Sequence, residues 1–122
     1  PMFKKLSLEM GGKNPLVILA DADLEAAADA AVLGAFACSG QWCTSTSRVI
    51  IEKSVESKVL DMIFQRTKKL VVGKGTDSAT TMGPVCGKSQ LTNILASIKN
   101  SNSRCPLCRP RGFSKRIGKI RR

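Results

Sequence analysis

Short apolar runs alternate with segments of helical periodicity along residues 6–99, and this alternation most constrains the fold. Residues 16–19 and 48–52 are apolar or β-branched and have the length of buried strands. Residues 23–36 and 55–68 repeat apolar side chains at helical spacing. The pattern predicts an α/β fold, with a mostly parallel sheet flanked by helices. The expected order is strand 6–9, strand 16–19, helix 23–36, strand 48–52, helix 55–68, strand 70–73 and helix 88–99.

The ends of these elements are marked by residues that favour caps and turns. Asp21 and Asp23 precede the first helix, and Ser54 precedes the second and offers it an N-cap. Gly40 ends or bends the chain beyond the first helix. Because the first helix is rich in alanine, we expect it to pack closely against the sheet.

Charge divides the chain into two parts. Residues 1–90 hold eleven Lys and Arg against nine Asp and Glu, whereas residues 91–122 hold nine Lys and Arg and no acid. Since the periodicity also ends near Asn100, we expect a folded part at 1–99 and a basic, disordered tail at 100–122. Such a tail could bind nucleic acid by neutralising phosphates. Phe113 is its only aromatic residue, however, so the composition favours a solvated cationic end.

The sequence contains no targeting or membrane-spanning segment. No run approaches the ~20 apolar residues that a membrane helix needs. The first five residues lack the apolar core of a signal peptide. We therefore expect a soluble, cytoplasmic protein without a membrane partner.

The cysteines favour neither a disulfide framework nor a metal site. They number five, an odd count. Cys105 and Cys108 have the spacing of zinc ligands, but zinc needs two further ligands, and the sequence has no His and no second pair of this spacing. We therefore predict no metal site. Cys38 lies in an apolar segment, and we interpret it as a small buried hydrophobic residue.

Cys43 and Glu9 have the settings that covalent catalysis needs. Cys43 follows Gly40 and Gln41 on a connection between a helix and a strand, where α/β folds place chemistry. A thiolate there can attack the carbonyl carbon of an aldehyde. Glu9, shortly before a pair of glycines, could deprotonate the water that releases the acyl group. The residues alone also allow an ordinary buried thiol and a solvated turn carboxylate.

Two longer motifs carry a resemblance to a known family. Residues 8–15, LEMGGKNP, resemble the glutamate signature of the aldehyde dehydrogenase superfamily. Residues 36–43, FACSGQWC, resemble its cysteine signature, and the 34 residues from Glu9 to Cys43 are similar to the family's separation. Further segments that match in the family's order are 21–24, 47–49 and 82–85. The resemblance covers residues 5–99.

The resemblance implies an oxidoreductase that converts a small-molecule aldehyde to a carboxylic acid with NAD or NADP. Cys43 would form a thiohemiacetal and, after hydride release to the nicotinamide, a thioester. Glu9 would be the general base for hydrolysis of that thioester. The residues of these motifs resemble those of semialdehyde dehydrogenases in particular. The resemblance also implies that the intact enzyme is a homo-oligomer.

The sequence also departs from the family's pattern. Trp42 stands where relatives often carry Arg or a smaller residue, and Ser45 replaces a small Ala, Gly, Cys or Asn. The family's subunit is several times longer, and its dinucleotide-binding turn is absent here, so no cofactor-binding residue is assigned. We therefore expect residues 1–99 to be a fragment of the catalytic domain, with little or no activity alone. The alternatives are a non-catalytic truncated remnant and a small basic nucleic-acid-binding protein.

Overall fold

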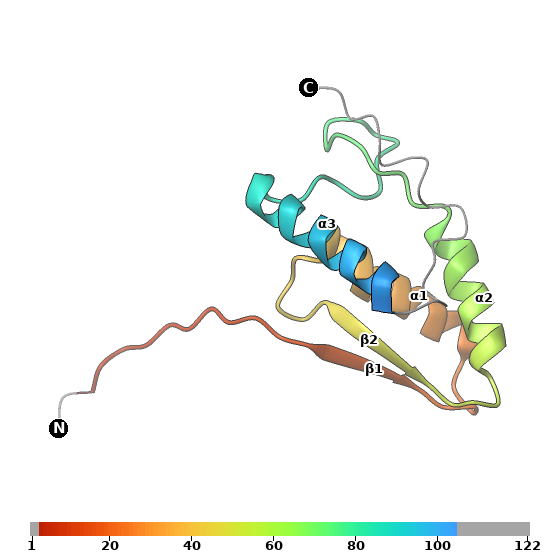
Figure 1. The fold of residues 1–122 in the computed structure, drawn as a ribbon. Helices are drawn as coiled ribbons and strands as arrows, with labels where there is room; N and C mark the ends of the chain where they lie inside the picture. The colour runs from red at the N-terminus through yellow and green to blue at the C-terminus, as the bar shows by residue number, and fades with distance from the viewer. Residues whose placement is uncertain (1–2, 105–122) are drawn as a thin grey trace. The chain divides into compact units, whose positions relative to one another are not determined.

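The computed structural model describes residues 3–104 and divides into two compact units, Pro1–Val85 and Cys86–Arg122. The second unit contains α3 (Gly87–Arg104). The first unit contains β1 (Asn14–Ile18), α1 (Leu24–Phe36), the short 3-10 turn η1 (Ala37–Gly40), β2 (Thr46–Ile51) and α2 (Glu56–Thr67), as shown in Figure 1. The α/β class predicted from the sequence is confirmed.

The sheet of the first unit consists of two parallel strands. β1 pairs with β2 in the register Leu16 to Val49 and Ile18 to Ile51. A register shift lies at the start of β1, between Asn14 and Pro15. Because parallel neighbours need a long crossover, the chain passes through α1 between the two strands (Figure 1).

Helix α1 begins and packs as its sequence predicts. The Asp23 carboxylate accepts hydrogen bonds from the Glu25 and Ala26 N–H groups, at 3.0 and 3.1 Å, and thereby caps the helix. Small side chains let the helix lie close to β2: a Cβ added to Gly34 would stand 2.5 Å from the Thr46 hydroxyl oxygen.

The core of the first unit is small and aliphatic. Ile18 of β1 and Val59 of α2 are 1% and 0% exposed, and the other buried apolar residues, all on α1, are Ala28, Ala31 and Val32. By contrast, Val17 and Ile50 stand opposite each other on the other face of the sheet, 58% and 54% exposed. Parallel strands ordinarily bury both faces, so the burial in this unit is one-sided.

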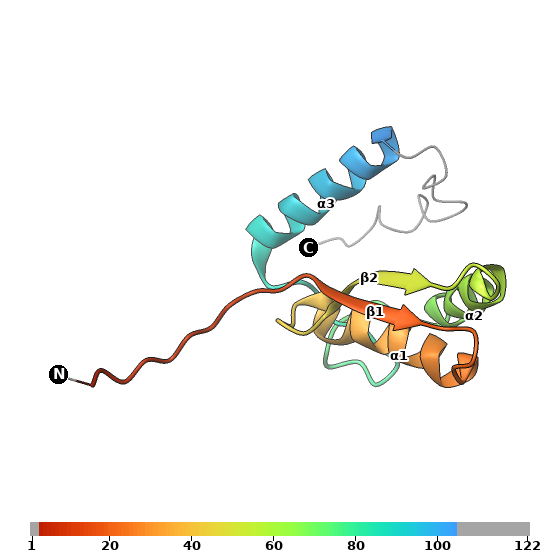
Figure 2. The same ribbon diagram turned by 90° about the horizontal axis from the view of Figure 1, so that it is seen from below.

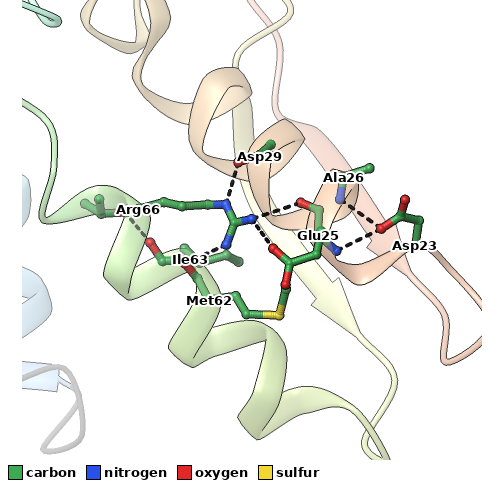
Figure 3. A network of polar contacts seen from close by, with 8 residues as sticks. Asp23, Glu25, Ala26, Asp29, Met62, Ile63 and Arg66 are labelled. Atoms are coloured by element: carbon green, nitrogen blue, oxygen red, sulfur yellow. Dashed lines mark hydrogen bonds and ion pairs between the residues drawn. The ribbon is translucent and has the colours of Figure 1, made fainter.

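Helices α1 and α2 are also joined by ion pairs. Figure 3 shows the Arg66 guanidinium of α2 reaching to the carboxylates of Asp29 and Glu25 on α1. The hydrogen bond to Asp29, followed by that to Glu25, raises the pKa of Arg66 above its ordinary value. Both carboxylates are exposed, so the contact mainly orients the two helices.

Two predicted strands and one predicted helix cap in the first unit are wrong. Residues 3–13 form no strand and leave the sheet along an extended path, seen in Figure 2. The segment near residue 70 forms only an isolated bridge, from Val72 to Met82, because it finds no partner in the sheet. Ser54 does not cap α2: its hydroxyl donates to the Glu52 carboxylate at 2.8 Å, and Val55 occupies the N-cap position without a side-chain bond.

Helix α3 is longer than expected. It begins at Gly87 and continues to Arg104, whereas the sequence predicted a helix at 88–99. Each residue added to an existing helix gains a backbone bond, which allows weak helix formers to extend it. The predicted tail lies outside the described residues from Cys105 onward, together with Cys108 and Phe113, so its disorder stays a prediction. Within residues 3–104 no helix is long and apolar enough to cross a membrane.

Candidate active site around Cys43

Cys43 lies on an irregular turn between η1 and β2, and its side chain is exposed. The turn is preceded by left-handed backbone at Cys38, Ser39 and Gly40, with φ of 48°, 60° and 70°. For a residue other than glycine this conformation costs about 1–2 kcal/mol. Cys38 is exposed as well, so its predicted burial is wrong. The chain leaves α1 before this residue, which therefore does not lie on the packed face of the helix.

Side-chain hydrogen bonds hold the left-handed segment in place. The Ser39 hydroxyl donates to the Gly83 carbonyl oxygen at 2.7 Å. The Gln41 side chain and its backbone N–H both donate to the Cys38 carbonyl oxygen, at 3.1 and 3.2 Å. The cysteine signature is therefore tied to the segment 82–85 through Ser39, a residue that the sequence did not single out.

Ser45 closes the turn around Cys43. Its backbone N–H donates to the Trp42 carbonyl oxygen at 3.1 Å, and its hydroxyl accepts from the Trp42 N–H at the same distance. Ser45, which departs from the family's pattern, therefore makes a side-chain hydrogen bond that an alanine at this position could not make. The Cys43 N–H has no hydrogen-bond acceptor within residues 3–104. Trp42 beside it is 51% exposed.

The C-terminal part of the glutamate signature contacts this turn. The Asn14 side-chain amide donates to the carbonyl oxygens of Cys43 and Ser45, at 2.7 and 3.2 Å. Gly12 lies so close that an added Cβ would stand 2.8 Å from the Cys43 carbonyl oxygen, whereas a Cβ on Gly11 would meet nothing within 4 Å. The two signatures are thus in contact, although 29 residues separate Asn14 from Cys43.

Glu9 lies on the extended segment before this contact. Its side chain is exposed, and in the described part of the chain no hydrogen bond joins it to Cys43. Three extended residues span at most about 11 Å, so the Glu9 backbone stays within that distance of Gly12. The structure brings the two segments together but not the two functional groups. The catalytic roles of Cys43 and Glu9 stay predictions.

A cavity of about 530 Å³ lies elsewhere in the first unit. Its lining is mostly apolar and comes from α1, from the first residue of η1 and from the segment 70–81: Asp29, Ala30, Val32, Leu33, Phe36, Ala37, Leu70 and Thr81. Neither Cys43 nor Glu9 lines it, so this cavity is not the candidate active site.

The strand-to-helix connections of this unit do not fit the pyrophosphate of a dinucleotide. Such a group binds open N–H donors at a helix N-terminus. At α1 the Asp23 carboxylate already occupies the Glu25 and Ala26 N–H groups. Helix α2 carries the acid Glu56 in its first turn. Asp23 therefore adds negative charge at the first connection, and at the second the Glu56 carboxylate occupies the Lys53 ammonium, at 2.6 Å, that could otherwise attract phosphate.

Comparisons with known proteins agree with the motifs. The aldehyde dehydrogenase family model matches residues 1–110, which extends past the predicted limit at residue 99. An α-ketoglutaric semialdehyde dehydrogenase from Bacillus subtilis is 46% identical over 95 residues, which cover 78% of this chain and 20% of that protein. A betaine aldehyde dehydrogenase from Brucella ovis is 37% identical over 101 residues, covering 83% of this chain and 21% of that protein.

Solved structures give the same result. Betaine aldehyde dehydrogenase from Staphylococcus aureus in complex with NAD+ matches with a TM-score of 0.75 and 35% identity, over 79% of this chain and 19% of that one. A mutant of the same protein carries a BME-modified cysteine. HpcC from Thermus thermophilus matches with a TM-score of 0.76 and 32% identity, over 80% and 19% of the two chains.

The chain spans about a fifth of the length of these relatives. The family match nevertheless covers most of the chain and includes both signature segments. The protein therefore belongs to the aldehyde dehydrogenase family.

Proposed function

We propose that this chain contributes the nucleophile and the general base to an NAD(P)+-dependent oxidation of a small-molecule aldehyde to a carboxylic acid. Cys43 is the nucleophile, and Glu9 is the base. The observation that carries the proposal is the contact between the two signatures, because Gly12 and Asn14 of the glutamate signature lie against the backbone of the exposed Cys43.

The first step is the attack of the Cys43 thiolate on the aldehyde carbonyl carbon. A bond forms between Sγ and that carbon, and the π electrons of the C=O bond move to the oxygen. The resulting oxyanion needs a hydrogen-bond donor. Since the Cys43 N–H has no acceptor among the described residues, it is available for this role.

Oxidation of the adduct to a thioester requires a two-electron acceptor, and NAD(P)+ is the class that the family's NAD+ complexes favour. The two strand-to-helix connections described here do not fit its pyrophosphate, so we assign no residue of this chain to cofactor binding. We expect the isolated chain to have little or no dehydrogenase turnover for this reason. The proposal includes a homo-oligomeric, cytoplasmic enzyme, as the family resemblance implies.

The last step is hydrolysis of the thioester. Water attacks the acyl carbon while the Glu9 carboxylate takes a proton from it, and the C–S bond breaks to release the acid and the Cys43 thiolate. This step requires the Glu9 side chain to approach Cys43. The absence of close neighbours at Gly11 leaves room for the segment to bend there.

The relatives indicate the class of aldehyde. The semialdehyde and betaine aldehyde dehydrogenases among the relatives act on small aldehydes by their names. We propose a semialdehyde as the first substrate class to assay, because the relative at 46% identity is a semialdehyde dehydrogenase.

Acylation by 4-nitrophenyl acetate tests the two residues without a cofactor. The Cys43 thiolate would displace 4-nitrophenolate and form a thioester that mass spectrometry can locate. We expect Cys43→Ser to abolish this adduct and Glu9→Gln to lengthen its lifetime roughly a hundredfold. Asp21→Asn, on the connection between β1 and α1, is the control carboxylate. An unchanged lifetime in Glu9→Gln would remove Glu9 from the mechanism.

The remnant alternative is tested by thiol selectivity in the same chain. A catalytic thiol is partly ionised near neutral pH and reacts faster than an ordinary exposed cysteine. We expect iodoacetamide to modify Cys43 faster than Cys86, which is also exposed. Equal rates would favour a non-catalytic remnant, and assays with NAD+, NADP+ and an aldehyde panel would show whether the chain turns over by itself.

A further inference from the structure

We propose that Asn14 is a positioning residue for Cys43, and that its side-chain amide sets the orientation of the nucleophile from outside the turn that carries it. The proposal rests on the proposed function of Cys43. Neither the motifs nor the comparisons assign a role to Asn14, which stands at the end of the glutamate signature and at the first position of β1.

The Asn14 amide has two N–H groups, and there are two acceptors within its reach. Nδ2 lies 2.7 Å from the Cys43 carbonyl oxygen and 3.2 Å from the Ser45 carbonyl oxygen. The Asn14 side chain is therefore a two-point clamp on the backbone that follows the nucleophile. Gly12 leaves space for it, since a Cβ at that position would stand 3.1 Å from Nδ2 and 3.3 Å from Oδ1 of Asn14.

The clamp completes the restraint of Cys43. Peptide groups are planar, so holding one oxygen holds the whole group. The Ser45 N–H holds the Trp42 carbonyl and thereby the peptide that carries the Cys43 N–H. Asn14 holds the Cys43 carbonyl and thereby the next peptide. With the peptides on both sides fixed, the backbone torsions of Cys43 are fixed, and with them the direction of its Cα–Cβ bond, from which the Sγ atom extends.

Asn14 also binds the negative end of the Cys43 carbonyl dipole. If that oxygen were unbonded and turned toward the thiolate, its partial negative charge would raise the energy of the thiolate, because like charges disfavour the ionised form. The amide donors hold the Cys43 carbonyl on the Asn14 side. A carboxylate at this position would have no donor for the two carbonyls and would add a negative charge.

A purely structural role, joining β1 to the chain before β2, is the rival explanation. The Ser47 hydroxyl provides a matched control, because it donates to the Asn14 carbonyl oxygen at 3.3 Å and joins the same two strands without touching Cys43. Ser47→Ala removes a strand contact, whereas Asn14→Ala and Asn14→Asp remove the clamp on the nucleophile.

The experiment measures iodoacetamide alkylation of Cys43 and Cys86 in the full 122-residue chain, resolved by peptide mass spectrometry from pH 6 to about 10, the span around the thiol's ordinary pKa. Since two hydrogen bonds are lost, we expect Asn14→Ala to lower the Cys43-to-Cys86 rate ratio roughly tenfold. Asn14→Asp should lower it further and move the midpoint of the Cys43 profile to higher pH. Asn14→Ser, with one donor, should fall between the parent and Asn14→Ala, and Ser47→Ala should match the parent.

The outcomes separate this proposal from the one on which it rests. If the parent Cys43 reacts faster than Cys86 and keeps the same ratio and pH midpoint in all three Asn14 variants, Asn14 has no positioning role and only this inference fails. If the parent Cys43 is no faster than Cys86, the proposed function fails and this inference with it. A fall in Ser47→Ala as large as that in Asn14→Ala would assign the effect to strand contact and overturn the positioning role.

Discussion

The scaffold of β1, β2, α1 and α2 and the turn around Cys43 belong to the same compact unit but are stabilised by different interactions. The scaffold buries Ile18 and Val59 almost completely, and its helical and strand backbone is regular. The turn and the left-handed segment before it bury none of their side chains, and that segment contains two residues other than glycine at positive φ. Their contacts are mostly side-chain hydrogen bonds to backbone oxygens, from Ser39 and Asn14.

The two regions should therefore respond differently to substitution. Burying a large aliphatic side chain contributes about 1.5–3 kcal/mol through the area it removes from water. A single hydrogen bond contributes only about 0.5–1.5 kcal/mol net, but its strength depends on the relative orientation of donor and acceptor. Substitutions in the scaffold should therefore lower global stability, and substitutions in the turn should mainly change the geometry at Cys43.

The largest effect on stability should come from Ile18→Ala in the scaffold. We expect the free energy of unfolding to fall by about 3 kcal/mol, because the variant leaves a cavity under α1. Val17→Ala, one residue earlier on the exposed face, should change it by less than about 0.5 kcal/mol. Urea denaturation of both variants measures the contrast. Equal losses would mean that the outer face of the sheet is also buried in solution.

The scaffold was also the part that the sequence predicted best. The helices at 23–36 and 55–68 and the strands at 16–19 and 48–52 were predicted from periodicity and apolar runs, local properties that burial enforces. The capping role of Asp23 was predicted for the same reason, since a cap bonds to N–H groups only two and three residues ahead. The parallel sheet followed from the alternation of strands and helices.

The candidate site was predicted only as a pair of motifs. Ser39 and Asn14 were missed because their acceptors lie 44 and 29 residues away, and no local pattern shows such bonds. Ser54 was misassigned because its hydroxyl found the Glu52 carboxylate instead of the helix backbone. A paired-strand alignment of β1 and β2 would have placed Asn14 opposite Thr46, three residues after Cys43. That is the only signal that pointed toward the clamp.

The next largest effect should be at Gly12, where the two signatures touch. Gly12→Ala places a Cβ 2.8 Å from the Cys43 carbonyl oxygen, so the backbone must move. We expect a loss of about 2 kcal/mol in stability and a lower Cys43 alkylation rate. Gly11→Ala is the matched control, because its Cβ would meet nothing within 4 Å. If both variants behave alike, the contact between the signatures is not populated in solution.

A smaller effect should distinguish strain from hydrogen bonding at Ser39. Ser39→Ala loses the bond to the Gly83 oxygen and keeps the left-handed backbone, so we expect a loss of about 1 kcal/mol. Ser39→Gly loses the same bond but relieves strain worth about 1–2 kcal/mol. The glycine variant should therefore be the more stable of the two in thermal unfolding. The reverse order would show that residue 39 is not left-handed in solution.

The smallest effect concerns a polar contact inside the scaffold. The Glu52 carboxylate, just after β2, accepts from the Ala20 N–H and from the Ser54 hydroxyl, both at 2.8 Å. The first of these bonds, and then the second, lowers the pKa of Glu52 below its ordinary value of 4.5. This contact is the counterpart, in the scaffold, of the side-chain bonds that hold the turn.

The sign of the pH dependence follows from the lowered pKa. Because folding favours the charged carboxylate, the stabilisation is fully present above pH 4.5 and is lost as the pH falls through the lower folded value. We expect Glu52→Gln to flatten the decline in thermal stability below pH 4.5, while Asp21→Asn, an exposed carboxylate next to Ala20, serves as the control. The change should be small because Glu52 is exposed to solvent. A steep decline that survives in Glu52→Gln would show that the Glu52 bonds do not cause it, so that the scaffold, unlike the Cys43 turn, does not depend on this side-chain contact.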